Sequence, residues 1–311
     1  MHGVGDISGA VRRALPVEDG TVSFLEWEGP SAAPILVFLH ANGFHARTYR
    51  TVLAPLADRF RIIAPDMRGH GLTSLAADLP KAGWTTYRDD LLRFIDKLGV
   101  RPAVLAGHSM GATVSLMAAG ARPDIAHALV LAEPVLQPDR VAAYALFARS
   151  FGLADRLLPR VGPAARRRSH FPSRADALKA YTGRGAFRSW PETAVADYVE
   201  GGLVADDGQF RLACAPQWES RLFSMFPFGL ARLGRRVRIP VTILGAGEHS
   251  SAIDSVVDGF VRRNRQARFL RVPGTSHFLP LEQPEIFRAE VLNALGQMLP
   301  ASALRSSPSV E

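Results

Sequence analysis

The strongest chemical pattern in the chain is a serine between two glycines, in the segment Gly107-His108-Ser109-Met110-Gly111. The segment fits the pattern Gly-x-Ser-x-Gly, and it lies between an apolar run that predicts a strand and a small-residue run that predicts a helix. In that setting the glycines permit a tight turn that lifts the serine hydroxyl above the edge of a sheet. The following helix directs backbone N–H groups at developing negative charge. The segment therefore predicts that Ser109 is a nucleophile.

A serine hydroxyl is a poor nucleophile until a base accepts its proton. The chain contains nine histidines, and we expect His277 to be the base, because it follows the last predicted strand and a loop that contains glycine. We expect His108 to pack inside the turn and His40 to support a neighbouring loop. Three further histidines are expected in loops or at the rim of the site: His45, His70 and His249.

The elements that must position these residues are short apolar strands that alternate with helical segments. The predicted strands are residues 13–18, 21–28, 35–39, 61–64, 103–106, 128–132, 241–244 and 268–272. The predicted helices are residues 48–58, 87–98, 111–120, 254–263 and 284–298. The first two strands flank Asp19-Gly20, a strong hairpin signal. The alternation predicts an α/β fold, with a mostly parallel central sheet flanked by helices.

The alternation is interrupted between residues 137 and 235, where helical patterns occur without a convincing buried strand. A structureless loop of that length is implausible in a globular domain. We therefore expect an α/β core in residues 1–135 and 236–300, with a helical lid in residues 136–235 inserted after the sixth strand. Residues 301–311 are rich in Ser and Pro, and we expect a disordered tail there.

Four motifs in order resemble the α/β-hydrolase superfamily, over about residues 13–300. They are His40-Ala41-Asn42-Gly43-Phe44 after the third strand, Pro65-Asp66-Met67-Arg68-Gly69-His70-Gly71 after the fourth, the segment around Ser109, and Gly274-Thr275-Ser276-His277-Phe278. The resemblance implies the α/β-hydrolase fold, a nucleophile elbow at Ser109, an oxyanion loop at residues 40–44 and a catalytic histidine at position 277. It points to an esterase- or lipase-like member with a helical lid.

The acid that would orient His277 has two candidates. Members of the superfamily usually place it after the seventh strand in a pattern such as Gly-Glu-x-Asp. Aligning on Gly247 puts Ser250 at the acid position, whereas aligning on Gly245 makes Glu248 the acid. Some relatives place the acid after the sixth strand, where this chain has Glu133. A carboxylate that ends a buried strand needs a partner, so we favour Glu133 and keep Glu248 as the alternative.

The oxyanion hole needs two backbone N–H donors close to the nucleophile. Met110 follows Ser109 and is expected to supply one of them. The resemblance places the second donor in the loop of residues 40–44. Aligning on His40 selects Asn42, which we prefer, and aligning on Gly43 selects Phe44 as the alternative.

Composition excludes several classes of protein. Cys214 is the single cysteine, which rules out an intramolecular disulfide and a multi-cysteine metal site. No apolar run is long enough to span a bilayer and no secretory signal is evident, so we expect a cytoplasmic protein without an integral membrane segment. No phosphate-binding glycine loop, dinucleotide motif or metal-binding pair of histidines occurs, so we expect no cofactor and no metal.

The chain is basic, with 37 Lys and Arg against 29 Asp and Glu and a net charge of +8. The cations are mostly arginines scattered along the chain, which argues against a nucleic-acid-binding protein. The predicted insertion holds 15 Lys and Arg against 9 Asp and Glu. We interpret its densest cluster, Arg166-Arg167-Arg168, as a solvated helical face.

The predicted function is that of a carboxylesterase-like serine hydrolase, which cleaves a small-molecule carboxylic ester through an acyl-enzyme intermediate. A serine nucleophile separates this chain from haloalkane dehalogenases and epoxide hydrolases of the same fold, which use an aspartate. A carbon–carbon bond hydrolase or an acyltransferase with the same triad is the alternative. A non-catalytic ligand-binding protein on this scaffold is an alternative of another class. The sequence does not define the acyl and alcohol groups of the substrate, the pathway or the oligomeric state.

Overall fold

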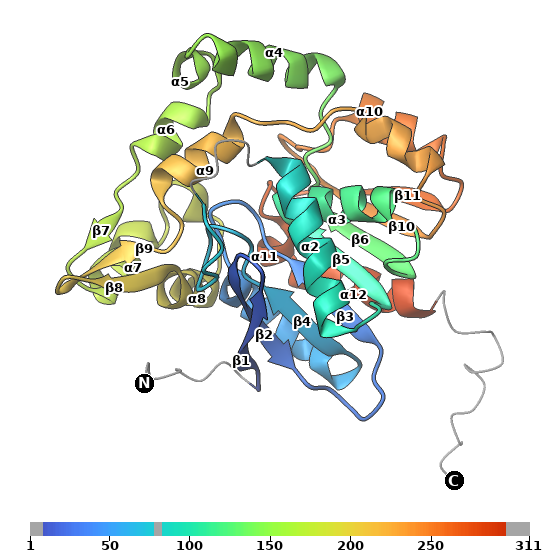
Figure 1. Cartoon of the computed structure of the whole chain (residues 1–311), viewed down its shortest axis with the longest axis horizontal. Helices are drawn as coiled ribbons and strands as arrows, with labels where there is room; N and C mark the ends of the chain where they lie inside the picture. Colours follow the sequence, from blue (N-terminus) through green and yellow to red (C-terminus); the bar gives the residue numbers. More distant parts are fainter. Residues whose placement is uncertain (1–8, 78–82, 297–311) are drawn as a thin grey trace.

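The computed structural model describes residues 9–77 and 83–296. Its centre is an eight-stranded sheet in the order β1-β2-β4-β3-β5-β6-β10-β11 (Figure 1). The strands are β1 (Val11–Val17), β2 (Gly20–Trp27), β3 (Ile35–Leu39), β4 (Arg61–Pro65), β5 (Val104–His108), β6 (Ala128–Ala132), β10 (Val241–Ala246) and β11 (Ala267–Val272). β1 and β2 form an antiparallel hairpin, β2 pairs antiparallel with β4, and the pairs from β4 to β11 are parallel. The expected α/β fold with a mostly parallel sheet is confirmed.

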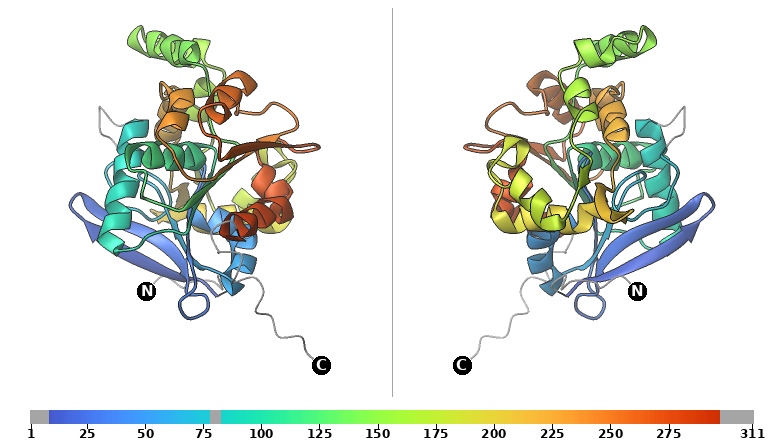
Figure 2. Two further views of the ribbon diagram at one scale, coloured as in Figure 1. Left: turned by 90° about the vertical axis from the view of Figure 1, so that its right-hand side faces the viewer. Right: turned by 90° about the vertical axis from the view of Figure 1, so that its left-hand side faces the viewer.

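Helices cover both faces of this sheet (Figure 2). One face carries α2 (Trp84–Leu98), α3 (Met110–Ala121) and α10 (Asp254–Val261), and the other carries α1 (Arg50–Leu53) and α12 (Pro284–Gly296). Successive side chains of a strand point to opposite faces. In β3, Leu36 and Phe38 accordingly enter one core, whereas Val37 and Leu39 enter the other. This double burial explains the continuous apolar runs that predicted the inner strands.

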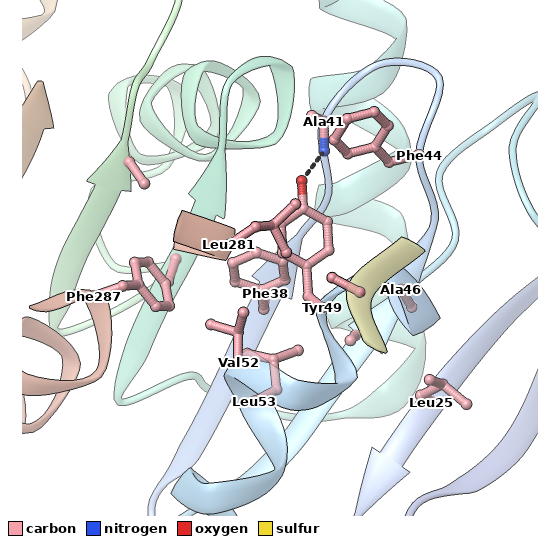
Figure 3. Packing of buried hydrophobic residues seen from close by; sticks show 14 of the residues in the cluster. Leu25, Phe38, Ala41, Phe44, Ala46, Tyr49, Val52, Leu53, Leu281 and Phe287 are labelled. Carbon is pink, nitrogen blue, oxygen red and sulfur yellow. Dashed lines mark hydrogen bonds between the residues drawn. The ribbon is translucent and has the colours of Figure 1, made fainter. Parts of the chain in front are cut away.

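The core beneath α12 is built around aromatic rings (Figure 3). The ring of Phe38 lies 4.7 Å from that of Tyr49 and 5.7 Å from that of Phe287, measured between centroids. The Tyr49 hydroxyl accepts a hydrogen bond of 3.2 Å from the backbone N–H of Ala41. The apolar core is thereby joined to the loop that follows β3.

The chain leaves the central sheet after β6 and returns to it at β10. The helices between them are α4 (Asp139–Ser150), α5 (Ala154–Leu157), α6 (Val161–Ala165), α7 (Arg174–Tyr181), η3 (Gly185–Phe187), α8 (Glu192–Gly202), α9 (Pro216–Phe223) and η4 (Leu230–Arg235). Residues 301–311, expected to form a tail, lie outside the described residues. Within the described ranges, no helix is long and apolar enough to cross a membrane.

The insertion is mostly helical, as expected, but it is not helical throughout. The insertion contains a separate antiparallel sheet in the order β7-β9-β8, formed by β7 (His170–Phe171), β9 (Gln209–Leu212) and β8 (Leu203–Asp206). These strands have only two to four residues and mixed polarity, so they carry no buried apolar run. The turn Asp207-Gly208 between β8 and β9 has positive φ at both residues and is the local signal that could have revealed this hairpin.

Candidate active site

Ser109 lies in the sharp turn between β5 and α3. Its φ of 53° is unusual for a residue with a side chain, and the neighbouring glycines make the turn possible. A Cβ at position 111 would lie 2.2 Å from the carbonyl oxygen of Leu39, and one at position 107 would lie 2.6 Å from the carbonyl carbon of Gly111. The close approach of α3 to the end of β3 therefore requires glycine at position 111, and the tight turn from β5 into α3 requires it at position 107.

Three predicted side chains meet at the carboxyl ends of the strands. The Oγ of Ser109 lies 2.9 Å from Nε2 of His277, and Nδ1 of His277 lies 3.0 Å from Oε2 of Glu133. The second contact places the ring proton on Nδ1, because a carboxylate only accepts hydrogen bonds, and it leaves Nε2 free to accept the serine proton. Glu248 is exposed on the loop after β10, and the carboxylate that contacts His277 is that of Glu133.

Glu133 is fully buried at the end of β6 and has a φ of 50°. Besides His277, its carboxylate accepts hydrogen bonds from the N–H of Ala246 (2.5 Å), the hydroxyl of Ser250 (2.5 Å) and the N–H of Ser251 (2.9 Å). Burial acts to raise the pKa of Glu133, but the hydrogen bonds and charge of His277 and the bonds from Ser250 and Ala246 outweigh it and hold the pKa at about 2. The carboxylate is therefore ionised at neutral pH.

Two backbone N–H groups are available as oxyanion donors beside Ser109. Met110 is the first residue of α3, so its N–H has no acceptor within the helix. In the loop after β3, the N–H of Gly43 donates to Nε2 of His70 (3.0 Å) and that of Phe44 donates to the carbonyl of Ala41 (3.1 Å).

In the described part of the chain the N–H of Asn42 has no hydrogen-bond acceptor. Asn42 also lines the same cavity as Ser109 and Met110, and Phe44 does not. The geometry thus favours Asn42 over Phe44 as the second donor.

Two buried histidines support the oxyanion loop. His40 donates from Nδ1 to the carbonyl of Ala41 (2.8 Å) and accepts from the N–H of Met67 at Nε2 (2.8 Å). His70 donates from Nδ1 to the carbonyl of Arg68 (2.9 Å) and accepts from Gly43. Burial lowers the pKa of His40 to about 4 and that of His70 to about 3, so both rings are neutral.

His40 therefore has the supporting role expected of it. His45, His70 and His249 lie in loops, as expected; the first two are buried there, whereas His249 is exposed.

A chain of hydrogen bonds joins the oxyanion loop to the backbone of the candidate base. Ala41 N–H donates to Tyr49 Oη (3.2 Å), Tyr49 donates to Nδ1 of His108 (2.6 Å), and Nε2 of His108 donates to the carbonyl of His277 (2.6 Å). Tyr49 and His108 are completely buried. Burial, followed by the proximity of His277, lowers the pKa of His108 to about 3. His108 packs inside the turn as expected, and it also positions the loop of His277.

The insertion contacts the oxyanion loop through a buried ion pair. Arg167 donates to Oε2 of Glu219 (2.6 Å) and to Oη of Tyr198 (2.7 Å). The side-chain amide of Asn42 donates to the Glu219 carbonyl (3.0 Å), and a Cβ on Gly43 would lie 2.6 Å from Oε1 of Glu219. The interpretation of Arg167 as part of a solvated face was therefore wrong, because its side chain is largely shielded from solvent and pairs with Glu219.

A cavity of about 400 Å³ opens beside Ser109. The insertion supplies most of its wall, with the apolar side chains of Val141, Tyr144, Leu157, Leu158, Pro159, Leu222, Phe223, Met225 and Phe226. Its volume falls in the range of small-molecule sites. Within residues 9–77 and 83–296, no three His, Cys, Asp or Glu side chains are grouped so that they could hold a metal ion.

Comparison with known proteins gives a consistent result. A family model described as "Alpha/beta hydrolase family" matches residues 36–290. The chain is 27% identical over 267 residues to the 2-(acetamidomethylene)succinate hydrolase of Mesorhizobium japonicum, which covers 84% of this chain and 88% of that protein. It is 35% identical over 120 residues to the epoxide hydrolase of Caballeronia sordidicola, which covers 38% of this chain and 36% of that protein.

A solved structure has the same architecture. The crystal structure of an E-2-(acetamidomethylene)succinate hydrolase superposes with a TM-score of 0.74 at 22% identity and covers 92% of this chain and 99% of that chain. The two sequence relatives are hydrolases, which supports a hydrolase, and the solved structure supports the fold.

Acid should destabilise the protein well before its carboxylates are protonated. In the folded state burial holds the pKa of His40 and His45 at about 4 and that of His70 and His108 at about 3, against an ordinary value of 6.5. Below pH 6.5 the unfolded chain therefore binds more protons than the folded one, and the free energy of unfolding falls by up to about 1.4 kcal/mol per histidine per pH unit. Melting temperatures measured from pH 7.5 to 4.5 should decline from about pH 6.5. A constant melting temperature over that range would contradict the neutral state of these rings.

Tyr49→Phe removes the hydroxyl that links Ala41 to His108. The oxyanion loop should then shift relative to His277, and the reactivity of Ser109 should fall by roughly ten- to hundredfold. The measurement is the labelling rate of Ser109 with a fluorophosphonate. Tyr87→Phe is the matched control, since the Tyr87 hydroxyl is also buried and donates to the carbonyl of Arg68 (3.0 Å). Both variants should lose stability, by about 1–3 kcal/mol. Equal labelling rates in the two variants would show that the Tyr49 hydroxyl does not position the oxyanion loop.

Proposed function

This chain belongs to the alpha/beta hydrolase family, and we propose that it is a serine hydrolase that cleaves a carboxylic ester through an acyl-enzyme intermediate. The observation that carries the proposal is the continuous contact from Ser109 Oγ to His277 Nε2 (2.9 Å) and from His277 Nδ1 to Glu133 (3.0 Å). A nucleophile, a base and an orienting carboxylate in this geometry form the arrangement that activates serine in hydrolases.

In the first half of the reaction, Ser109 Oγ attacks the ester carbonyl while His277 Nε2 takes the hydroxyl proton. The carbonyl oxygen becomes an oxyanion, which accepts hydrogen bonds from the N–H groups of Asn42 and Met110. The intermediate then collapses as the bond to the alkoxy oxygen breaks, and His277 gives its proton to the leaving alcohol. Glu133 stabilises the imidazolium through Nδ1–H throughout.

In the second half, a water molecule attacks the acyl carbon of the ester on Ser109. His277 accepts a proton from the water and returns a proton to Ser109 Oγ as the acid leaves. The enzyme regains its starting protonation state, and each turnover consumes one ester and one water. The protein's own residues supply each of these proton transfers.

The cavity favours a small or medium substrate with an apolar portion, because apolar side chains of the insertion dominate its wall. We propose that residues 136–235 act as a lid that selects the substrate, while the core residues perform the reaction. The partner of the enzyme is a small-molecule ester, and we place the protein in the cytoplasm.

A carbon–carbon bond hydrolase or an acyltransferase is the second candidate. Both use the same serine chemistry, and one relative is named for 2-(acetamidomethylene)succinate rather than for an ester. The partial match to an epoxide hydrolase carries less weight, because the superfamily resemblance gives such enzymes an aspartate where this chain has Ser109.

Ser109→Ala should lower the turnover of p-nitrophenyl esters by about 10³-fold or more without lowering the melting temperature, because the hydroxyl is small and the turn remains. A series of esters of graded chain length supplies the substrates. A fluorophosphonate should label the wild-type protein and leave Ser109→Ala unlabelled. Wild-type protein that resists labelling would favour the ligand-binding alternative, and Ser109→Ala with most of its activity would refute the acyl-enzyme mechanism.

Glu133→Gln should lower kcat by roughly 10²–10⁴-fold, because an amide keeps the shape of the side chain but loses the charge that stabilises the imidazolium. Glu248→Gln is the matched control on the neighbouring loop, and it should leave kcat nearly unchanged. Melting temperatures of both variants separate a loss of catalysis from a loss of folding. The reverse ranking of the two kcat values would show that Glu248 is the orienting acid.

A further inference from the structure

The wall of the cavity beside Ser109 contains one arginine, Arg160, and no lysine, aspartate or glutamate among the described residues. Besides Ser109, the other polar side chains of the lining are Asn42, Gln137, Tyr144, His249, Ser250 and Ser251. The two serines already donate to Glu133. Arg160 is therefore the strongest fixed charge that a bound molecule would meet in this cavity.

Arg160 lines this cavity and forms no ion pair with a described carboxylate. The arginines of the insertion that do form ion pairs lie outside the cavity lining: Arg167 with Glu219, Arg174 with Glu200, Arg211 with Asp206 and Arg232 with Asp139. The guanidinium of Arg160 lies instead 5.9 Å from the ring centre of Phe223, which also lines the cavity. A cation held over an aromatic ring keeps its edge N–H groups available to an acceptor.

We propose that Arg160 binds a carboxylate at the far end of the substrate, so that the enzyme acts on esters whose acyl chain ends in an acid group. The inference rests on the proposed function of the chain as a serine hydrolase. The planar guanidinium matches a carboxylate through two parallel hydrogen bonds, and the apolar wall suits the hydrocarbon segment between the carboxylate and the scissile ester. A cavity of about 400 Å³ has room for such a half-ester of a dicarboxylic acid.

The charge of the surroundings supports an acidic substrate. The insertion holds 15 Lys and Arg against 9 Asp and Glu, and no acidic side chain of the described residues lines the cavity to repel an anion. A neutral ester would fill the apolar part of the cavity equally well but would gain nothing from Arg160. Selectivity for the acidic ester should therefore depend on this one side chain and weaken as salt concentration rises.

The test uses two alkyl fluorophosphonates of equal chain length, one ending in a carboxylate and one in a methyl group. In each, Ser109 Oγ displaces fluoride, so the labelling rate reports both the reactivity of the serine and the fit of the chain. Wild-type protein should prefer the carboxylate probe. Arg160→Met should slow labelling by that probe about tenfold or more, as expected for a lost hydrogen bond to a charged group, and leave the methyl probe unchanged. Arg160→Lys should retain part of the preference.

Arg156→Met is the matched control, because Arg156 is exposed on the same insertion and lies outside the cavity lining. It should leave both labelling rates unchanged. Equal slowing of both probes in Arg160→Met would assign Arg160 a structural role and overturn the inference, as would an unchanged rate for the carboxylate probe or a wild type without preference. In those cases labelling by the methyl probe still supports an activated serine. Failure of both probes to label wild-type protein would overturn the proposed function and this inference together.

Discussion

The arrangement of the site depends on one buried charge, the carboxylate of Glu133 at the end of β6. An ionised carboxylate with no exposure is costly unless its oxygen atoms are satisfied, and four residues from the end of β10 and two loops satisfy them here. The last residue of β10 supplies the N–H of Ala246, the loop after it supplies Ser250 and Ser251, and the loop after β11 supplies His277. The same charge that would stabilise an imidazolium therefore also holds two loops in place, so the fold and the chemistry share one constraint.

Three buried histidines near the site are neutral, and both ring nitrogens of each form hydrogen bonds. His40, His70 and His108 each donate through one ring nitrogen and accept through the other. Their low pKa values follow from burial, and they keep positive charge away from His277, whose protonation would drive the reaction. Neutral histidines thus act as rigid two-ended connectors between loops that no strand hydrogen bond reaches.

The sequence predicted those features of the fold and site that depend on residues close together in the chain. The buried strands were evident because both faces of the sheet are covered, the serine turn because only glycine fits at positions 107 and 111, and Glu133 because a carboxylate ending a buried strand needs a partner. The roles of Tyr49 and Arg167 were not predicted, since their partners lie 59 and 52 residues away and nothing local marks the contact. The β8–β9 hairpin was missed although its Asp207-Gly208 turn was visible.

The reacting groups lie directly after β3, β5, β6 and β11, whereas the insertion forms most of the cavity wall. This division would let the insertion vary with the substrate while the reaction centre stays constant. It is incomplete at one place, because the side chain of Asn42 donates to the backbone of Glu219, whose carboxylate lies against Gly43 and pairs with Arg167. Removing either partner of a buried ion pair leaves an uncompensated charge that costs about 3–5 kcal/mol. The insertion therefore helps to fix the position of the oxyanion loop. The ion pair between Arg167 and Glu219 thus connects the part of the chain that would select the substrate to the part that would stabilise the transition state.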